Sequence, residues 1–278
     1  MGRRRPQRGE RGQHAAQPGG GPRARNAWFF ELRGSSRQMT IGIWQSIPQP
    51  MISRYLGQMG WDWIILDLQH GAMNWETAYE CIHAIRATGA RPLVRTAIGA
   101  PGDVEKALDL GAGGIVVPMV NSLGTAKAVA DAAKYPPTGV RSLGGDNFLH
   151  YGADYFEKAN DDTLLLVQME HIDGVDACAD IMALPGVDGC FVGPVDLAIS
   201  LGLSRHREEY EKEPAQKAAL KKVIDTTLAA GKLACCNTYS PDDFAAQKAA
   251  GFQAITLKSD LDLLLDRGSA LLAELKDK

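Results

Sequence analysis

One apolar segment of the sequence ends in side chains that can do chemistry. Residues 61–73 read WDWIILDLQHGAM, in which an apolar run closes on Asp67, Gln69 and His70. Polar groups of this kind are costly to bury at the end of a strand unless they find partners. Imidazole titrates near neutral pH, so His70 can act as a base or assist one. We therefore interpret His70 as a catalytic residue, and a structural histidine is the alternative.

A second group of side chains supplies carboxylates. The segment LLLVQME ends in Gln168 and Glu170, which lie on the same side of a strand because they are two residues apart, and Asp196 follows the next apolar segment. Carboxylates on neighbouring strands repel each other and are costly to bury without a cation. Two protein oxygens suit Mg²⁺ or Mn²⁺ better than Zn²⁺. The alternative is that one carboxylate pairs with Arg95 or Arg141.

Two further side chains close apolar segments of the same kind. Arg95 ends PLVR, and its planar fork can bind a substrate carboxylate and stabilise an enolate oxygen. A salt bridge from Arg95 to Asp67 or Glu170 is the alternative. Trp44 lies near the end of TIGIWQ, where it either lines a pocket or fills the interior of the fold.

The elements that position these residues alternate regularly along the chain. Helical patterns separate short apolar, β-branched segments, and no G-x-G-x-x-G follows the first of them. Eight such units within about 220 residues favour a closed (β/α)8 barrel over an open doubly wound sheet. We predict a single α/β domain, a TIM barrel, over residues 26–278. The predicted strands are residues 40–45, 63–69, 91–96, 114–120, 164–170, 189–194, 232–237 and 254–259.

Helical periodicity fills the intervals between most of these strands. Active sites of such barrels lie at the carboxyl ends of the strands, so the polar side chains above are expected to converge there. The stretch 135–162 exceeds an ordinary connection, and we predict a functional or interface excursion there. The clearest predicted helices are residues 75–88, 104–110, 122–134, 216–230 and 241–250.

Composition bounds the compartment and the partners. The first 25 residues hold seven Arg, six Gly and three Pro without an apolar run, which predicts a disordered tail, although an Arg-rich targeting peptide is an alternative. Residues 26–278 carry 23 Lys plus Arg and 32 Asp plus Glu, a net charge of −9 that argues against nucleic-acid binding. No apolar run is long enough for a membrane.

The five cysteines lie in apolar segments without metal-type spacing: Cys81, Cys178, Cys190, Cys235 and Cys236. They indicate reduced core thiols and a cytoplasmic location.

At these positions the sequence resembles the HpcH/HpaI aldolase and citrate lyase β family, in particular its class II pyruvate aldolases such as 4-hydroxy-2-oxoheptanedioate aldolase. The resemblance covers about residues 26–270, in which the motifs occur in family-like order and spacing. The motifs that carry it are GIW (42–44), GWDWIILDLQH (60–70), PLVR (92–95), LDLGA (108–112), VPMV (117–120), YPPTGVR (135–141), VQME (167–170) and GPVDL (193–197).

The resemblance implies a role for each candidate residue. Glu170 and Asp196 would hold a divalent cation, Mg²⁺ or Mn²⁺, with Co²⁺ as a further option. Arg95 would stabilise the enolate, and His70 would be the base or would activate water on the cation. Gln168 and the backbone near Val195 would contact the substrate, and we predict Trp44 and Asp196 as further substrate-binding residues.

The family also pairs the histidine with an acidic residue that matches Asp109. This residue ends a predicted helix that runs from the top of the barrel to its bottom, and a strand of six residues spans about 20 Å. Asp109 should therefore not reach His70 of its own chain. If the pair exists, it crosses a subunit interface, so we predict a homo-oligomer.

These residues lead to one hypothesis and three alternatives. The hypothesis is reversible cleavage of a 4-hydroxy-2-oxo acid to pyruvate and an aldehyde. The alternatives are a Schiff-base aldolase that uses Lys258, a CoA-ester lyase, for which no basic pocket is evident, and a non-catalytic barrel that binds oxo acids. One departure is Gln69, which replaces a glutamate of the relatives and leaves the aldehyde open.

Overall fold

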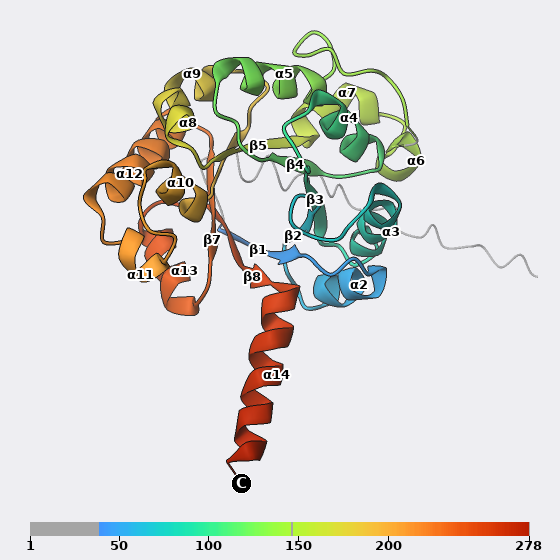
Figure 1. Ribbon diagram of the computed structural model, residues 1–278. Coiled ribbons are helices and arrows are strands. Elements are labelled where there is room, and N and C mark those ends of the chain that lie inside the picture. The colour runs from blue at the N-terminus through green and yellow to red at the C-terminus, as the bar shows by residue number, and fades with distance from the viewer. Residues whose placement is uncertain (1–38, 146, 278) are drawn as a thin grey trace, which may run out of the picture.

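The computed structural model describes residues 39–145 and 147–277, and their strands form a closed parallel barrel. Each strand pairs with the next, and β8 pairs with β1 (Figure 1). The predicted TIM barrel is confirmed, whereas the predicted tail over residues 1–25 lies outside the described residues. The strands are β1 (Thr40–Gln45), β2 (Trp63–Asp67), β3 (Arg91–Arg95), β4 (Gly114–Val117), β5 (Leu164–Met169), β6 (Gly189–Val192), β7 (Leu233–Thr238) and β8 (Ala254–Ser259).

Helices surround the barrel, and local sequence sets where they begin. Asn74 and Ser122 accept backbone hydrogen bonds at the starts of α3 and α5, as N-cap residues do. Pro101 starts α4 three residues earlier than periodicity predicts, because proline suits the first turn. The helices are α2 (Pro50–Gln58), α3 (Trp75–Arg86), α4 (Pro101–Asp109), α5 (Leu123–Ala133), α6 (Asn147–Tyr151), α7 (Tyr155–Asp162), α8 (Ile172–Asp176), α9 (Cys178–Ala183), α10 (Pro194–Ser200), α11 (Arg207–Tyr210), α12 (Pro214–Ala229), α13 (Pro241–Ala249) and α14 (Asp260–Lys276).

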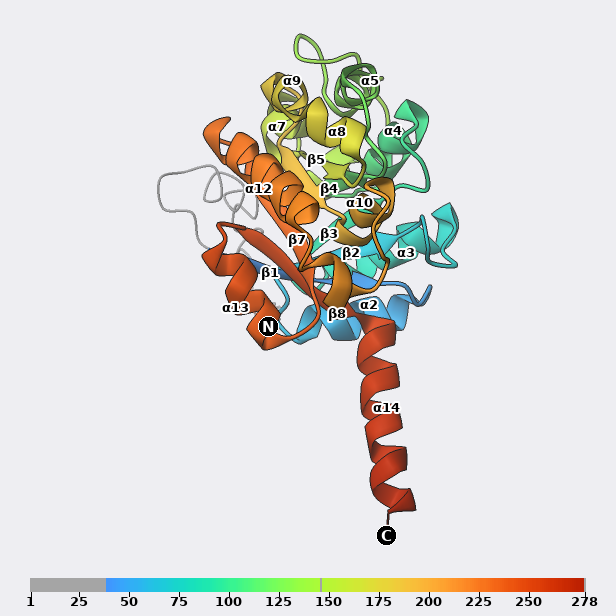
Figure 2. The same cartoon turned by 60° about the vertical axis from the view of Figure 1, so that its left-hand side comes forward.

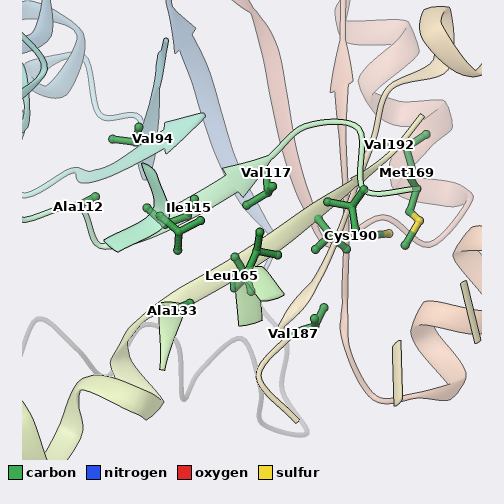
Figure 3. Packing of buried hydrophobic residues seen from close by; sticks show 14 of the residues in the cluster. Val94, Ala112, Ile115, Val117, Ala133, Leu165, Met169, Val187, Cys190 and Val192 are labelled. Atoms are coloured by element: carbon green, nitrogen blue, oxygen red, sulfur yellow. The ribbon is translucent and has the colours of Figure 1, made fainter. Parts of the chain in front are cut away.

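The strands are buried on both faces, and alternate residues serve two separate cores. In β2, Trp63 and Ile65 belong to the core inside the barrel, whereas Ile64 and Leu66 pack outward under the helices. Asp67 continues the inner series, because side chains alternate with a period of two. Figure 3 shows part of the outer layer over β3 to β6, with Val94, Ile115, Val117, Leu165 and Cys190 among its side chains.

Several strands end earlier than their apolar patterns predict. The Asp67 carboxylate accepts the backbone N–H groups of Gln69 at 3.0 Å and His70 at 3.1 Å, and this turn ends β2. In β4 and β6, Pro118 and Pro194 follow the last strand residues closely and cannot donate to a ladder. The polar end of the opening segment is therefore a structured turn at the barrel mouth.

The excursion over residues 135–162 lies at the opposite end of the barrel from this mouth. It holds α6 and α7, and α6 contacts the end of α4 and the loop that precedes β4. Asn147 Nδ2 donates to the carbonyl of Leu108 at 2.9 Å, and Tyr151 Oη donates to that of Gly111 at 2.9 Å. These bonds fix the excursion beside Asp109.

The last helix, α14, projects away from the barrel in both views (Figures 1 and 2). Asp260 anchors its first turn by accepting the backbone N–H groups of Ser46 and Ile47, and it is the buried residue of this helix. Leucines along the rest of the helix are exposed: Leu261, Leu263, Leu264, Leu265, Leu271, Leu272 and Leu275. The helix therefore carries apolar surface that its own barrel does not cover.

The five cysteines are free and buried, as predicted. Burial raises the pKa of the Cys190 thiol to about 12 and that of Cys178 to about 11, so these groups are neutral thiols. Among residues 39–145 and 147–277, no helix combines the length and the apolar character that crossing a membrane requires.

Candidate active site

Glu170 is a buried carboxylate immediately after β5, and two donors fix it. Its Oε1 accepts the backbone N–H of Met119 at 2.7 Å, and its Oε2 accepts Gln168 Nε2 at 2.8 Å. Burial is the main cause that raises the Glu170 pKa to about 7, and the nearby charge of Asp196 raises it further. The Met119 N–H and the Arg95 guanidinium act in the opposite direction. The structure thus brings Glu170, Asp196 and Arg95 within electrostatic reach.

The backbone around Glu170 is shaped to hold this side chain. A Cβ on Gly193 would lie 2.4 Å from Glu170 Oε2, so any larger residue would displace the carboxylate. Met119 has a φ of 54°, in the left-handed region that costs a non-glycine residue free energy. In this conformation the Met119 N–H donates to Glu170. The sequence did not identify Met119 or Gly193 as residues of the site.

The donors at this end of the barrel fit a hard divalent cation. Gln168 is 3% exposed, and its Oε1 has no hydrogen-bond partner among the described residues. That oxygen, the Glu170 carboxylate and the exposed carboxylate of Asp196 at the start of α10 are ligands of the type that Mg²⁺ and Mn²⁺ prefer. Across the described ranges, no three His, Cys, Asp or Glu side chains form a metal-binding cluster. A cation here would keep sites for water or substrate.

Arg95 pairs with Asp67, as the alternative interpretation held. Its Nε and Nη2 donate to the two Asp67 oxygens at 2.9 and 2.7 Å, and its Cζ lies 4.4 Å from the centre of the Trp44 ring. The side chain is 13% exposed, and Nη1 makes no hydrogen bond with any described residue. The salt bridge therefore orients the guanidinium and leaves one of its ends available. Arg141 instead pairs with Asp109.

Trp44 fills the barrel interior and is 8% exposed. The Trp44 and Phe191 rings pack edge to face, with their centres 5.3 Å apart. Trp44 Nε1 donates a hydrogen bond to Thr256 Oγ1 at 3.0 Å. The Thr256 hydroxyl donates in turn to Asn237 Oδ1 at 2.8 Å. Thr256 and Asn237 are polar residues near the ends of β8 and β7 that sequence reasoning missed, although their inward spacing was a signal that could have found them.

The remaining predicted residues lie on the loops and at the far end of the barrel. His70 is exposed beyond β2, and Val195 is half-buried in the first turn of α10. Asp109 ends α4 beside the excursion, where its Oδ1 accepts Arg141 Nη2 at 2.7 Å. It lies at the opposite end of the barrel from His70, so the structure does not bring these two together within one chain.

Lys258 is the penultimate residue of β8, and two observations describe its environment. Its φ is 56°, where the register between β1 and β8 shifts, and its ammonium pairs with Asp266 of α14. The amine therefore has a carboxylate partner outside the barrel interior.

Comparison with known proteins connects this geometry with a family. The HpcH/HpaI aldolase/citrate lyase family model matches residues 40–265. A hydroxypyruvate/pyruvate aldolase of Cupriavidus necator is 30% identical over 245 residues, which are 87% of this chain and 89% of that protein. A 5-keto-4-deoxy-D-glucarate aldolase of Escherichia coli O139:H28 is 32% identical over 206 residues, 73% and 79% of the two chains.

A solved structure agrees with this assignment. An HpcH/HpaI aldolase/citrate lyase family protein from Burkholderia cenocepacia J2315 superposes with a TM-score of 0.82 at 28% identity, covering 90% of this chain and 99% of that one. The family match spans the whole barrel and every strand end described above. The chain therefore belongs to the HpcH/HpaI aldolase/citrate lyase family.

Proposed function

We propose that this chain is a divalent-metal-dependent aldolase that reversibly cleaves a 4-hydroxy-2-oxo acid to pyruvate, or a closely related 2-oxo acid, and an aldehyde. The observation that carries the proposal is the buried Glu170 carboxylate beside Asp196 at the barrel mouth, with a pKa raised to about 7. A carboxylate held in this way gains most from a bound cation. Relatives named as aldolases for hydroxypyruvate or pyruvate and for a keto-deoxy sugar acid support the substrate class.

Glu170, Asp196 and Gln168 would hold the cation, which we propose to be Mg²⁺ or Mn²⁺. When bound, it would supply Lewis-acid polarisation of the 2-oxo group and a template for the substrate. The exposed position of Asp196 and the half-buried turn at Val195 leave that side of the site accessible to a 2-oxo acid. Trp44 and Phe191, whose rings contact each other inside the barrel, would form the apolar floor of the site.

Arg95 would stabilise negative charge on the enolate oxygen. Asp67 holds two of its nitrogens, and Trp44 lies against its plane, so the guanidinium is oriented before substrate arrives. Its unbound Nη1 can then donate to an oxygen of the three-carbon fragment. Preorganised donors of this kind favour the transition state because they need no rearrangement during the reaction.

His70 would accept the proton of the substrate 4-hydroxyl as the carbon–carbon bond breaks. It is exposed at the mouth, and the Asp67 carboxylate holds its backbone N–H at 3.1 Å. Asp67 therefore links the base with Arg95, because it binds both. The proton is then delivered to the methylene carbon of the enolate, which becomes the methyl group of pyruvate, so proton transfer balances over the cycle.

We also propose that the enzyme is a homo-oligomer in which Asp109 of one copy meets His70 of another. Asp109 lies at the barrel end opposite to His70 and is 35% exposed, so a second chain can reach it. The exposed leucines of α14 supply apolar surface for such an assembly. The free buried thiols are consistent with a reducing, cytoplasm-like compartment.

The test is an NMR assay of deuterium exchange into the methyl group of pyruvate, with Mg²⁺, with Mn²⁺ and with EDTA. Exchange reports enolate formation whatever the aldehyde is, and we expect it only with a divalent cation. Glu170→Gln should abolish it, whereas Glu208→Gln, which removes an exposed carboxylate on α11, should not. Equal exchange in EDTA would contradict the proposal, and borohydride trapping of pyruvate on Lys258 would then support a Schiff-base enzyme.

A further inference from the structure

The excursion at the far end of the barrel contains a buried cation that the mechanism above does not use. The Arg141 side chain is 0% exposed. Its Nη2 donates to Asp109 Oδ1 at 2.7 Å, its Nη1 donates to Tyr155 Oη at 3.1 Å, and its Cζ lies 4.7 Å from the centre of the Tyr135 ring. Residues of α4, of α7 and of the loop after α5 therefore fix the guanidinium, and the Asp109 carboxylate pairs with its charge.

The other oxygen of Asp109 remains accessible. Within residues 39–145 and 147–277, Oδ2 takes part in no hydrogen bond, and the side chain is 35% exposed. Two glycines pass beside it: Gly145 has a φ of 75°, and a Cβ on Gly144 would lie 4.0 Å from Oδ2. The segment that passes closest to Asp109 therefore adds no side chain beside its carboxylate at these two positions.

The excursion that holds Arg141 also carries exposed apolar side chains. Val140, Leu143 and Leu149, all on the excursion, are exposed, with 68 to 72% of each side chain open to solvent. Exposed apolar side chains that gather on one segment mark a surface at which another protein chain binds. The mouth of the barrel also carries exposed apolar side chains, because Ile98 and Met119 follow the ends of β3 and β4, and His70 is exposed after the end of β2.

We propose that Arg141 is a positioning residue of the active site: it holds Asp109 Oδ1 so that Oδ2 faces a second copy of this chain and binds its His70. This inference rests on the proposed function. A hydrogen bond from one ring nitrogen of His70 to Oδ2 would leave the other ring nitrogen to accept the substrate proton. The charged groups nearest to the His70 backbone in its own chain are Asp67, which accepts its N–H, and Arg95, which pairs with Asp67.

The positive charge of Arg141 also limits the effect of Asp109 on the base. An unpaired carboxylate would hold a protonated imidazole strongly and so raise its pKa. With Arg141 on the same carboxylate, the attraction of Asp109 for that positive charge is weaker. Removal of Arg141 should therefore move the acid limb of the pH–rate profile to higher pH, an effect that a merely structural residue would not produce.

The experiment mixes inactive variants after reversible dissociation and measures metal-dependent deuterium exchange into pyruvate. Arg141→Met should lower kcat by about 100-fold with little change in KM, as expected for a misplaced catalytic group. Arg141→Lys, which keeps the charge, should recover part of the loss. Lys127→Met, which removes an exposed cation paired with Asp131, is the matched control and should leave the rate unchanged.

Mixing shows on which side of the interface Arg141 acts. An Arg141→Met copy still carries a sound His70, so with His70→Gln copies it should regain about a quarter of the wild-type rate by random pairing. With Asp109→Asn copies it should regain nothing, because both variants damage the same side. If Arg141→Met does not fold, Arg141→Lys is mixed in its place.

Three results would overturn the inference. Recovery in the mixture with Asp109→Asn would place Arg141 on the other side of the interface, failure to recover with His70→Gln would give it a general structural role, and a normal kcat in Arg141→Met would give it no role. Absence of metal-dependent exchange in the wild-type protein is a different outcome, because it refutes the proposed function itself.

Discussion

Replacing Glu170 by Gln should stabilise the metal-free protein, but only above the pH at which an ordinary glutamate ionises. Burial raises the pKa of this carboxyl from 4.5 to about 7, a difference that corresponds to about 3 kcal/mol. The folded protein binds the proton more tightly than the unfolded chain does. The contribution of the protonated Glu170 to the free energy of unfolding is therefore complete below pH 4.5, and it is lost as the pH rises to about 7.

Glutamine does not titrate, so it removes this loss while keeping the shape of the side chain. Its oxygen can still accept the Met119 N–H, and Gln168 can turn its amide to present its unpaired Oε1 to the new NH₂ group. The variant and the wild type should unfold alike at pH 4.5. At pH 8 the variant should be more stable by about 3 kcal/mol, or roughly 6 to 12 °C in Tm for a domain of this size.

The measurement is urea or thermal unfolding in EDTA from pH 4.5 to pH 8. Glu208→Gln, at an exposed position on α11, controls for the loss of a negative charge. Saturating Mn²⁺ should reverse the order at pH 8, because the cation stabilises only the chain that can ligate it. A difference between Glu170→Gln and wild type that is the same at every pH would refute the reasoning from burial.

Three further predictions concern the same site. Below pH 7 the apparent affinity of the wild type for Mn²⁺ should fall by about tenfold per pH unit in calorimetry, because Glu170 must lose its proton first. Arg95→Lys, which keeps the charge but loses the fork on Asp67, should lower kcat/KM by about 100-fold in the pyruvate exchange assay. Gly193→Ala should weaken Mn²⁺ binding by displacing Glu170 Oε2 while circular dichroism stays unchanged; undiminished binding would refute the contact.

The barrel and the residues at its mouth could be predicted because they depend on periodicity. Polar residues that continue the inward series of a strand must point into the barrel or its mouth, and Asp67, Arg95 and Gln168 all do so. The pairing of Arg95 with Asp67 could not be decided in this way. It follows from the register of β2 against β3, which places the two residues directly opposite each other, and register depends on the assembled sheet.

Other features of the site could not be predicted because they lie in loop backbone or in tertiary packing. The left-handed conformation of Met119 is unfavourable for its residue type, so local propensity gives no sign of it. The sequence also does not reveal that α14 projects away from the barrel. Its leucines recur at the spacing expected of a helix that packs on its own barrel. The place of the short helix α6 depends on bonds to the end of α4 and to the loop between α4 and β4.

The exposed leucines of α14 make dilution an experimental variable. If another chain shelters them, part of the free energy that maintains each barrel is intermolecular, and it weakens as the chains are separated by mass action. Turnover per chain would then decline at the low enzyme concentrations of a sensitive assay, even though every catalytic group is present. The melting temperature would rise with concentration for the same reason.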